Sequence, residues 1–299
     1  MIENNILCLN NNFSTTRCLI KKQPVIENKL EDKFQSVLFL PKGKNRKYTG
    51  GLRTKGYFKI FYDEKPLISI ITAVYNGEQF LEKTIQSVIN QTYNNIEYII
   101  IDGGSTDGTL NIIKKYEDKI DYIVSESDNG IGDAFNKGIR CVSGNYINFL
   151  NAGDYFLDNS IIYSNLKYFK KKYTIITSFV KFGNITIPRY KLNNSMPLYK
   201  KARISHQASF VAMQIFKDKG LFDTNIEIRM DYEFWMRILN DYNFLFIPEI
   251  MIYYDDNGVS SNNIDKFYNE ELQINNKYLN IYLNIFRKIQ IYIIRQLKQ

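Results

Sequence analysis

The sequence predicts an α/β fold built on a mainly parallel, buried central sheet flanked by helices. Short β-branched runs alternate with segments of helical period, a pattern typical of βαβ units. Three of these runs, at 67–74, 96–101 and 146–150, end in stretches rich in Gly, Asn and Asp. In open α/β sheets ligands bind beyond the carboxyl ends of the strands. We therefore expect residues 67–154 to carry the chemistry.

Strand and helix alternate through the first half of the chain. Apolar residues at helical spacing predict helices over 78–90 and 131–142. Thr106 or Asp107 is expected to cap a third helix that reaches about Tyr116. The strands of this half are expected at 67–74, 96–101, 120–124 and 146–150.

The second half contains fewer clear signals. In chain order we expect a helix over 159–172, a strand at 174–182, a strand at 208–212, helices at 213–219 and 231–240, and one long terminal helix over 266–296. The loop expected between 183 and 203 is long enough to be a functional lid or a partly ordered segment. Residues 1–36 are polar and Asn/Lys-rich, so we expect them to be flexible or loosely packed, followed by a strand at 35–40.

Charge is unevenly distributed along the 299 residues, whose net charge is +8. Residues 1–65 hold 13 Lys and Arg against 6 Asp and Glu, residues 272–299 hold 5 against none, and the middle is mildly acidic. A nucleic-acid binder places a basic stripe on its folded domain, so nucleic acid is not an expected partner. Basic ends fit an anionic membrane surface or an anionic acceptor.

Cysteine usage and hydropathy favour a cytoplasmic protein. Cys8, Cys18 and Cys141 are odd in number and lack metal-ligand spacing, which fits a reducing compartment. The first residues do not read as a signal peptide, and no apolar run approaches the roughly 20 residues of a spanning helix. We expect a peripheral association with the inner face of the plasma membrane.

Two carboxylates follow predicted strands. Asp102 precedes two glycines that let a ligand approach the backbone, and it can accept hydrogen bonds from a base or ribose or simply cap the turn. Asp154 suits a hard divalent ion that bridges to phosphates, although a surface turn is the alternative. Their shared sheet edge favours a ligand site. Neither strand is followed by GxGxxG, so a nicotinamide or flavin cofactor is not expected.

A predicted helix begins with Asp231 and Glu233, an arrangement that the helix dipole alone favours. Glu233 and Arg237, four residues apart, can form a simple ion pair. The functional alternative makes Asp231 a general base and Trp235 a wall for a sugar ring. His206, the sole histidine, is either structural or a contact to a ligand or diphosphate.

Six blocks of sequence, in order, resemble the donor half of family 2 glycosyltransferases. They are 72–77 (TAVYNG), 91–93 (QTY), 101–109 (IDGGSTDGT), 125–130 (SESDNG), 133–138 (DAFNKG) and 149–154 (FLNAGD). The segments 206–207 (HQ), 220–223 (GLFD) and 231–235 (DYEFW) look like the acceptor half of bacterial members that build surface polysaccharides. The resemblance covers roughly residues 50–260. It implies the GT-A fold, a nucleotide-diphosphate sugar donor, and Mn²⁺ or Mg²⁺.

The resemblance also implies site residues. Those expected to bind the nucleotide sugar are Thr72, Tyr75, Asn76, Glu78, Asp102, Gly104, Ser105, Asp128, Gly130, Asp133 and Asn136. Asp154 matches the last acid of the family's metal motif and Asp231 matches the catalytic base. The residues expected to contact the acceptor or diphosphate are His206, Glu233 and Trp235. The family motif usually has two adjacent acids where this chain has Gly153-Asp154, so we expect the ion to bind mainly with the diphosphate.

The implied function is an inverting, metal-dependent transfer from a UDP-sugar to a glycan or lipid-linked glycan in surface polysaccharide biosynthesis. The division implied is a basic, partly flexible extension (1–49), a glycosyltransferase domain (50–265, with halves 67–154 and 155–265) and a terminal helix (266–299). One alternative is a sugar-phosphate nucleotidyltransferase, although residues 75–78 offer no phosphate cradle. The other is a catalytically silent module that binds sugar or nucleotide.

Two basic or amphipathic features remain. In the long loop, the residues expected to fold over the diphosphate are Lys200, Lys201 and Arg203. The terminal helix carries an apolar stripe made of Tyr278, Tyr282, Ile285, Ile289, Ile293 and Leu297. This stripe is typical of a core or dimer contact, and it also fits an interfacial helix beside a lipid-linked acceptor.

Overall fold

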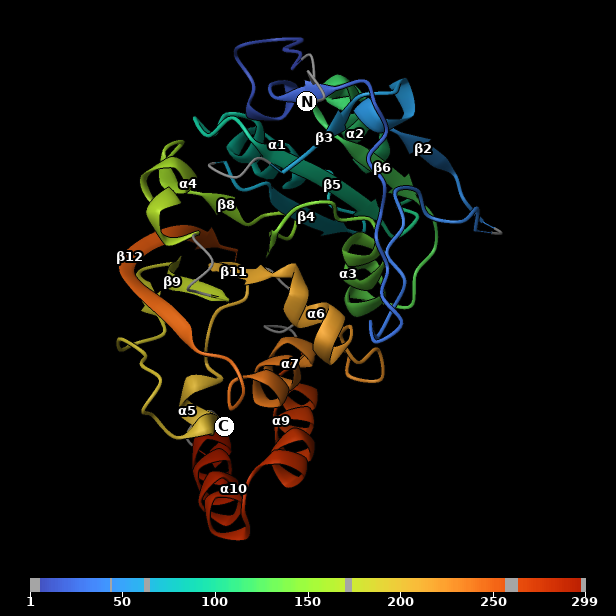
Figure 1. The fold of residues 1–299 in the computed structure, drawn as a ribbon. Coiled ribbons are helices and arrows are strands. Elements are labelled where there is room, and N and C mark those ends of the chain that lie inside the picture. Colours follow the sequence, from blue (N-terminus) through green and yellow to red (C-terminus); the bar gives the residue numbers. More distant parts are fainter. Residues whose placement is uncertain (1–5, 44, 62–64, 170–173, 256–262, 297–299) are drawn as a thin grey trace.

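The computed structural model describes residues 6–43, 45–61, 65–169, 174–255 and 263–296 (Figure 1). A mixed sheet forms its centre, and its strands are β2 (Tyr48–Gly50), β4 (Ile68–Val74), β5 (Ile96–Asp102), β6 (Tyr122–Ser125), β7 (Tyr146–Phe149), β8 (Tyr155–Phe156), β9 (Ile175–Phe182), β10 (Ile185–Ile187), β11 (Ser209–Ala212) and β12 (Phe244–Tyr254). The strand order is β2-β6-β5-β4-β7-β11-β9-β12-β8, with β10 paired to β9.

The four neighbouring strands β6, β5, β4 and β7 are parallel, and the sheet becomes mixed toward its edges. Every residue of β4 and β5 is buried, because helices cover both faces. Alternate side chains of β4 enter two different cores: Ile68 and Ile70 join one, Ile71 and Ala73 the other. The predicted α/β fold is confirmed in this part of the chain.

Helices divide between the two faces of the sheet (Figure 1). The core that contains Ile68 is covered by α1 (Leu81–Ile89), α2 (Thr109–Lys115) and α4 (Ile161–Ser164). The core that contains Ile71 is covered by α3 (Ile131–Arg140), α6 (Met213–Lys219) and α7 (Met230–Ile238). The carboxyl ends of the parallel strands are left facing the later elements of the chain.

Several expectations from the sequence for residues 35–203 need correction. Residues 35–40 form no strand, and the helix expected over 159–172 is α4 followed by a 3-10 turn at Leu166–Tyr168, with 170–172 outside the described residues. The expected loop 183–203 contains β10 and a short helix, α5 (Leu198–Lys201). Strand β12 was not expected, because Pro248 interrupts its apolar run; the strand accommodates this with register shifts between Ile247 and Ile252.

The N-terminal segment is packed more tightly than its composition suggests. A 3-10 turn at Ser14–Thr16 is buried, and Ser14 Oγ donates to the backbone carbonyl of Val88 at 3.0 Å. Strand β1 (Leu19–Ile20) pairs with β3 (Phe58–Lys59) in a separate two-stranded sheet. Residues 14–20 are therefore packed, although their sequence shows no apolar periodicity, because polar side chains anchor them to the rest of the protein.

Two helices replace the single terminal helix expected over 266–296. They are α9 (Ile264–Tyr278) and α10 (Ile281–Gln296), and Leu279 between them is extended. The Asn280 side chain accepts the Leu283 N–H at 2.9 Å, which is an N-cap that starts α10. Both helices lie at the end of the molecule opposite α1 and α2 (Figure 1).

Candidate active site

A cavity of about 1240 Å³ opens beyond the carboxyl ends of β4 and β7. Its walls come from the loop after β4, the turn after β7, the segment 202–207, and helices α7 and α10. Its polar lining includes Tyr75, Asn76, Asp154, Arg203, Ser205, His206, Arg229, Asp231 and Arg287. The fold thus gathers distant segments at the sheet edge where the chemistry was expected.

The loops that follow β4 and β5 hold each other in place. The Asn76 N–H donates to Ser105 Oγ at 2.8 Å, and Asn76 Oδ1 accepts the Thr106 N–H at 2.9 Å. Asn76 has a φ of 50°, a left-handed conformation that Asn adopts more readily than most residues. Tyr75 is 65% exposed and borders the cavity from this fixed loop. Its ring offers a flat apolar face to a ligand.

Asp102 lies beneath these loops and does not line the cavity. Its carboxylate accepts the Ser105 N–H at 3.2 Å, the Ser125 hydroxyl at 2.5 Å, and the Ser105 hydroxyl. Glu78 Oε2 similarly accepts the Gly108 N–H at 2.9 Å. Both acids therefore shape the loop at 103–108, and Asp102 caps the start of this loop.

The segment before α3 packs against the same loop. A Cβ at Gly104 would lie 3.2 Å from the Ser127 backbone nitrogen, and the φ of +83° also requires glycine. Asp128 Oδ1 accepts the Gly130 N–H at 2.9 Å, and burial raises the pKa of Asp128. Asp133 Oδ2 accepts a backbone N–H of the preceding turn at 3.1 Å. These residues lie together at the start of α3.

Two of the residues expected to bind the nucleotide sugar make their contacts within the protein. Thr72 is fully buried within β4, where its hydroxyl lies 3.0 Å from the Tyr98 hydroxyl. Asn136 exchanges two hydrogen bonds with the backbone of Phe222, both at 2.9 Å, and so ties α3 to the chain before α7. Neither side chain lines the cavity.

Asp154 is 1% exposed, yet it borders the cavity. Its Oδ1 accepts the Asp255 N–H at 3.0 Å, while its Oδ2 has no hydrogen-bond partner within the described residues. Burial raises the pKa of Asp154 to about 7, against the lowering effect of the Asp255 hydrogen bond. A buried carboxylate oxygen without a partner fits the oxygen preference and charge of a divalent ion.

Gly153 stands where the expected metal motif has a second acid, and its surroundings leave little room for a side chain. A Cβ at this position would lie 2.6 Å from Asp255 Oδ2, and its φ is +103°. An acidic side chain therefore does not fit here without moving Asp255. No group of three or more His, Cys, Asp or Glu in the part of the chain that the structure describes could hold a metal ion. Asp154 alone is an incomplete site, which fits an ion that takes further oxygen ligands from a diphosphate.

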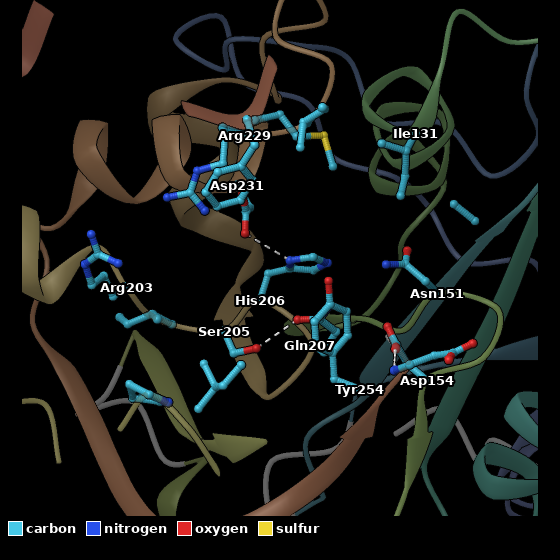
Figure 2. A pocket seen from close by; sticks show the side chains of 18 of the residues that line it. Ile131, Asn151, Asp154, Arg203, Ser205, His206, Gln207, Arg229, Asp231 and Tyr254 are labelled. Atoms are coloured by element: carbon cyan, nitrogen blue, oxygen red, sulfur yellow. Dashed lines mark hydrogen bonds and ion pairs between the residues drawn. The ribbon is translucent and has the colours of Figure 1, made fainter. Parts of the chain in front are cut away.

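His206 and Asp231 form a pair on the cavity wall (Figure 2). His206 Nδ1 lies 3.2 Å from Asp231 Oδ2, and Asp231 Oδ1 accepts the Tyr232 N–H at 2.7 Å. Burial raises the pKa of Asp231, but the hydrogen bond and charge of His206 and the charge of Arg229 outweigh it, so the pKa lies below its ordinary value. Asp231 is therefore ionised at neutral pH and can accept a proton.

Glu233 and Trp235 do not reach the cavity, which corrects their expected role. Trp235 is 2% exposed within the core, and Glu233 pairs with Arg237 at 3.2 Å and hydrogen-bonds to Tyr278. Successive residues of an α-helix are rotated by about 100°. Glu233, two residues after Asp231, therefore points to the other side of α7. The ion-pair reading of Glu233 is the one that the structure supports.

Three arginines line another part of the cavity, and the sequence indicated only one of them. Arg203 was expected beside Lys200 and Lys201, but Lys201 is buried and donates to the backbone carbonyl after α7 at 2.8 Å, and Lys200 is exposed outside the cavity lining. Arg229 and Arg287 come from segments far along the chain. No local spacing connects these three positions, so only the fold could bring them together.

A family model described as glycosyl transferase family 2 matches residues 69–228, more than half of the chain. The chain belongs to glycosyltransferase family 2. Among its relatives in this family, an uncharacterized glycosyltransferase of Rickettsia typhi is 32% identical over 203 residues, which are 62% of this chain and 63% of the relative. One of Methanocaldococcus jannaschii is 32% identical over 208 residues, covering 64% and 71%. The match thus spans less than two thirds of the Rickettsia typhi relative.

Solved structures of similar fold include complexes with a nucleotide or a nucleotide sugar. TarS (residues 1–349) of S. aureus aligns with a TM-score of 0.59 and 18% identity over 72% of this chain and 66% of that one. TarS structures contain UDP and UDP-GlcNAc. The mannosyltransferase PcManGT of Pyrobaculum calidifontis, in complex with GDP-Man and Mn²⁺, aligns with a TM-score of 0.53 and 16% identity, covering 65% and 59%. These likenesses confirm the GT-A fold expected of a family 2 glycosyltransferase. Among the described helices of this family member, none is long and apolar enough to cross a membrane.

Proposed function

We propose that this glycosyltransferase moves a sugar from a UDP-sugar to a glycan or lipid-linked glycan, with inversion, in the biosynthesis of surface polysaccharide. The observation that carries the proposal is a single cavity with Asp231 and His206 on one side and buried Asp154 on the other (Figure 2). Membership of family 2 supports glycosyl transfer. The UDP and UDP-GlcNAc complexes of TarS, a protein of similar fold, favour a uridine donor.

The donor's nucleotide would lie at the loops that follow β4 and β5. Tyr75 offers its exposed ring for stacking on a base, and Asn76 borders the same part of the cavity. Asp102 and Glu78 would act indirectly, because their carboxylates hold the loop at 103–108. The turn at 128–133 would close the pocket from the other side.

The reaction would be a single displacement. Asp231 takes the proton of the acceptor hydroxyl, the hydroxyl oxygen forms a bond to the anomeric carbon, and the bond from that carbon to the diphosphate breaks. The nucleoside diphosphate leaves on the opposite face, which inverts the configuration. His206 orients Asp231 and keeps its pKa low. This assignment agrees with Asp231 and Asp154 lying on different sides of His206 (Figure 2).

Asp154 would hold Mn²⁺ or Mg²⁺ together with the diphosphate. The bound ion would supply positive charge against the charge that develops on the leaving diphosphate. The unpartnered Oδ2 of Asp154 supports this role, and the space that Asp255 occupies beside Gly153 explains the reliance on the substrate's oxygens.

We further propose that α10 rests on the inner face of the plasma membrane, near a lipid-linked acceptor. Its exposed apolar side chains are Ile281, Tyr282, Ile285, Phe286, Ile289, Tyr292 and Ile293, while Leu297 lies outside the described residues. Tyr278, the first residue of the expected stripe, packs against the core instead. The proposed division of the chain remains an extension (1–49), a catalytic domain (50–265) and the terminal segment (266–299).

Thermal unfolding with UDP, GDP or CDP, each with and without Mn²⁺, tests the donor site. A ligand at 100 times its dissociation constant adds about 2.7 kcal/mol to the free energy of unfolding. We expect UDP with Mn²⁺ to raise the melting temperature of the wild type, and Asp154→Ala to abolish the metal-dependent part. If no nucleotide stabilises the protein, the silent-module alternative is favoured. Donor hydrolysis or sugar transfer in vitro separates an enzyme from such a module.

A further inference from the structure

We infer that Arg203, Arg229 and Arg287 form a subsite for a phosphate group carried by the acceptor. The inference rests on the proposed function, and it names the chemical class of the acceptor. All three side chains line the same cavity as Asp231. They come from the segment after α5, the start of α7 and the middle of α10, respectively.

The three guanidinium groups share a single carboxylate. Glu271 of α9 lies 3.4 Å from Arg203 Nη2 and 3.4 Å from Arg229 Nη2, and its Oε1 also accepts a hydrogen bond from Arg287. Glu271 is 1% exposed and Arg287 is 6% exposed. One carboxylate, that of Glu271, therefore pairs with all three guanidinium groups in a partly dehydrated place, while Arg229 also acts on the charge of Asp231.

In the part of the chain that the structure describes, two guanidinium donors of the cluster lack an acceptor, although Arg287 Nη1 donates to Gln290 Oε1. The Nε groups of Arg229 and Arg287 are buried, and neither finds a partner among the described residues. A buried donor without a partner is unfavourable, whereas a phosphate presents several oxygens and pairs with guanidinium groups in a bidentate manner. The Arg229 guanidinium is also fixed in place, 4.4 Å from the ring centre of Tyr232 and 4.3 Å from that of Phe267.

Electrostatics agree with this geometry. Burial lowers the pKa of Arg203, the charges of Arg287 and Arg229 act in the same direction, and Glu271 opposes them. Burial is the largest cause of this pKa shift, and the positive charges of Arg287 and Arg229 add to it, so the neighbouring arginines destabilise the charged form of Arg203. A bound anion would relieve this destabilisation.

The position of the cluster assigns it to the acceptor. Figure 2 shows Arg203, Arg229 and Asp231 on one side of His206, with Asp154 on the other. A phosphate on the arginines would thus lie beside the base and away from the carboxylate proposed for the donor's diphosphate. The family model ends at residue 228, so Arg229, Glu271 and Arg287 belong to the part of the chain beyond the shared core.

Calorimetric titration with inorganic phosphate tests the subsite, in EDTA so that no divalent ion is bound. The variant is Arg203→Gln, because the Arg203 side chain is 38% exposed and its replacement leaves the fold intact. Lys200→Gln is the matched control. It removes one positive charge three residues before Arg203, and the Lys200 side chain is exposed and does not line the cavity. Asp154→Ala shows whether the phosphate binds instead at the site proposed for the donor's diphosphate.

We expect the wild type, Lys200→Gln and Asp154→Ala to bind phosphate alike, and Arg203→Gln to bind it about tenfold more weakly, the effect of one charge-assisted hydrogen bond. The inference is overturned if the wild type does not bind phosphate, if both charge variants weaken binding equally, or if Asp154→Ala abolishes it. UDP with Mn²⁺, titrated into the same variants, reports separately on the donor site, so a failure of the proposed function remains distinguishable.

A second arm separates two sources of the phosphate. Glucose 1-phosphate represents a soluble phosphorylated glycan, and vesicles of phosphatidylcholine with phosphatidic acid represent a phosphate carried by a lipid. If Arg203→Gln binds only glucose 1-phosphate more weakly than Lys200→Gln does, the soluble source is supported. If Arg203→Gln binds the vesicles more weakly than Lys200→Gln does, the lipid source is supported. Unchanged binding of both probes contradicts the subsite.

Discussion

At the residue scale, Asp231 carries the proposed chemistry through its ability to accept a proton. Asp231→Asn keeps the size of the side chain but removes this ability. A positioned general base contributes about 10²- to 10⁴-fold, so we expect turnover to fall by that factor while UDP affinity is unchanged. Transfer rates and UDP titration measure the two effects. Asp241→Asn, at an exposed position paired with Lys219, is the control; wild-type turnover by Asp231→Asn would refute the role.

His206 sets the pH range in which Asp231 works. Burial raises the pKa of Asp231, and the hydrogen bond and charge of His206 lead the effects that bring it below its ordinary value. A base is active above its pKa, so activity falls as the pH drops through that value. His206→Ala removes the lowering effect, and we expect the acid limb of kcat/KM to move to higher pH. An acid limb at the wild-type pH would show that His206 does not control Asp231.

Some of the residues that the sequence singled out lie at the cavity, and others do not. Asp154, His206 and Asp231 all line the cavity. Glu233 and Trp235 do not: Glu233, two residues after Asp231, lies on the other side of α7, and Trp235, one helical turn further along than Asp231, is buried in the core. The arginine cluster was missed for another reason: its members are separated by tens of residues, and only tertiary structure relates them.

At the element scale, the parallel strands were predictable, and so were β9, β11, α6 and α7 of the second half, whereas β12 and the break between α9 and α10 were not. The runs at 68–74 and 96–102 are buried on both faces, so their composition alone indicates a strand. Strand β12 contains Pro248 within its length and pairs through register shifts, which disguise its periodicity. The break between α9 and α10 depends on one side-chain hydrogen bond rather than on hydrophobic pattern.

That hydrogen bond gives a test of the helix break. Asn280→Ala removes the N-cap of α10, which typically costs about 1 kcal/mol. We expect amide hydrogen exchange within α10 to speed up about fivefold, as measured by mass spectrometry. Lys288→Ala, at an exposed position within the same helix, should change the free energy by less than about 0.5 kcal/mol. Equal exchange in both variants would mean that Asn280 does not determine where α10 begins.

At the scale of the whole molecule, the two basic ends of the chain lie apart. The N-terminal segment packs near α1 and α2, whereas α10 lies at the opposite end (Figure 1). The exposed apolar residues are concentrated on α10, and residues 272–299 contain five Lys and Arg and no acids, so α10 is the end expected to bind.

This arrangement predicts which surface change abolishes membrane binding. Ile285 and Ile289 are 50% and 55% exposed, so replacing both with Glu should leave the fold intact. The double variant loses apolar contact, and each new charge is repelled by anionic lipid at about 1 kcal/mol, so flotation with anionic vesicles should fall at least about tenfold. The double variant Val25→Glu and Leu30→Glu makes the same change at exposed positions outside α10 and should float like the wild type. Equal losses in the two double variants would show that net charge, rather than the apolar face of α10, holds the protein at the membrane.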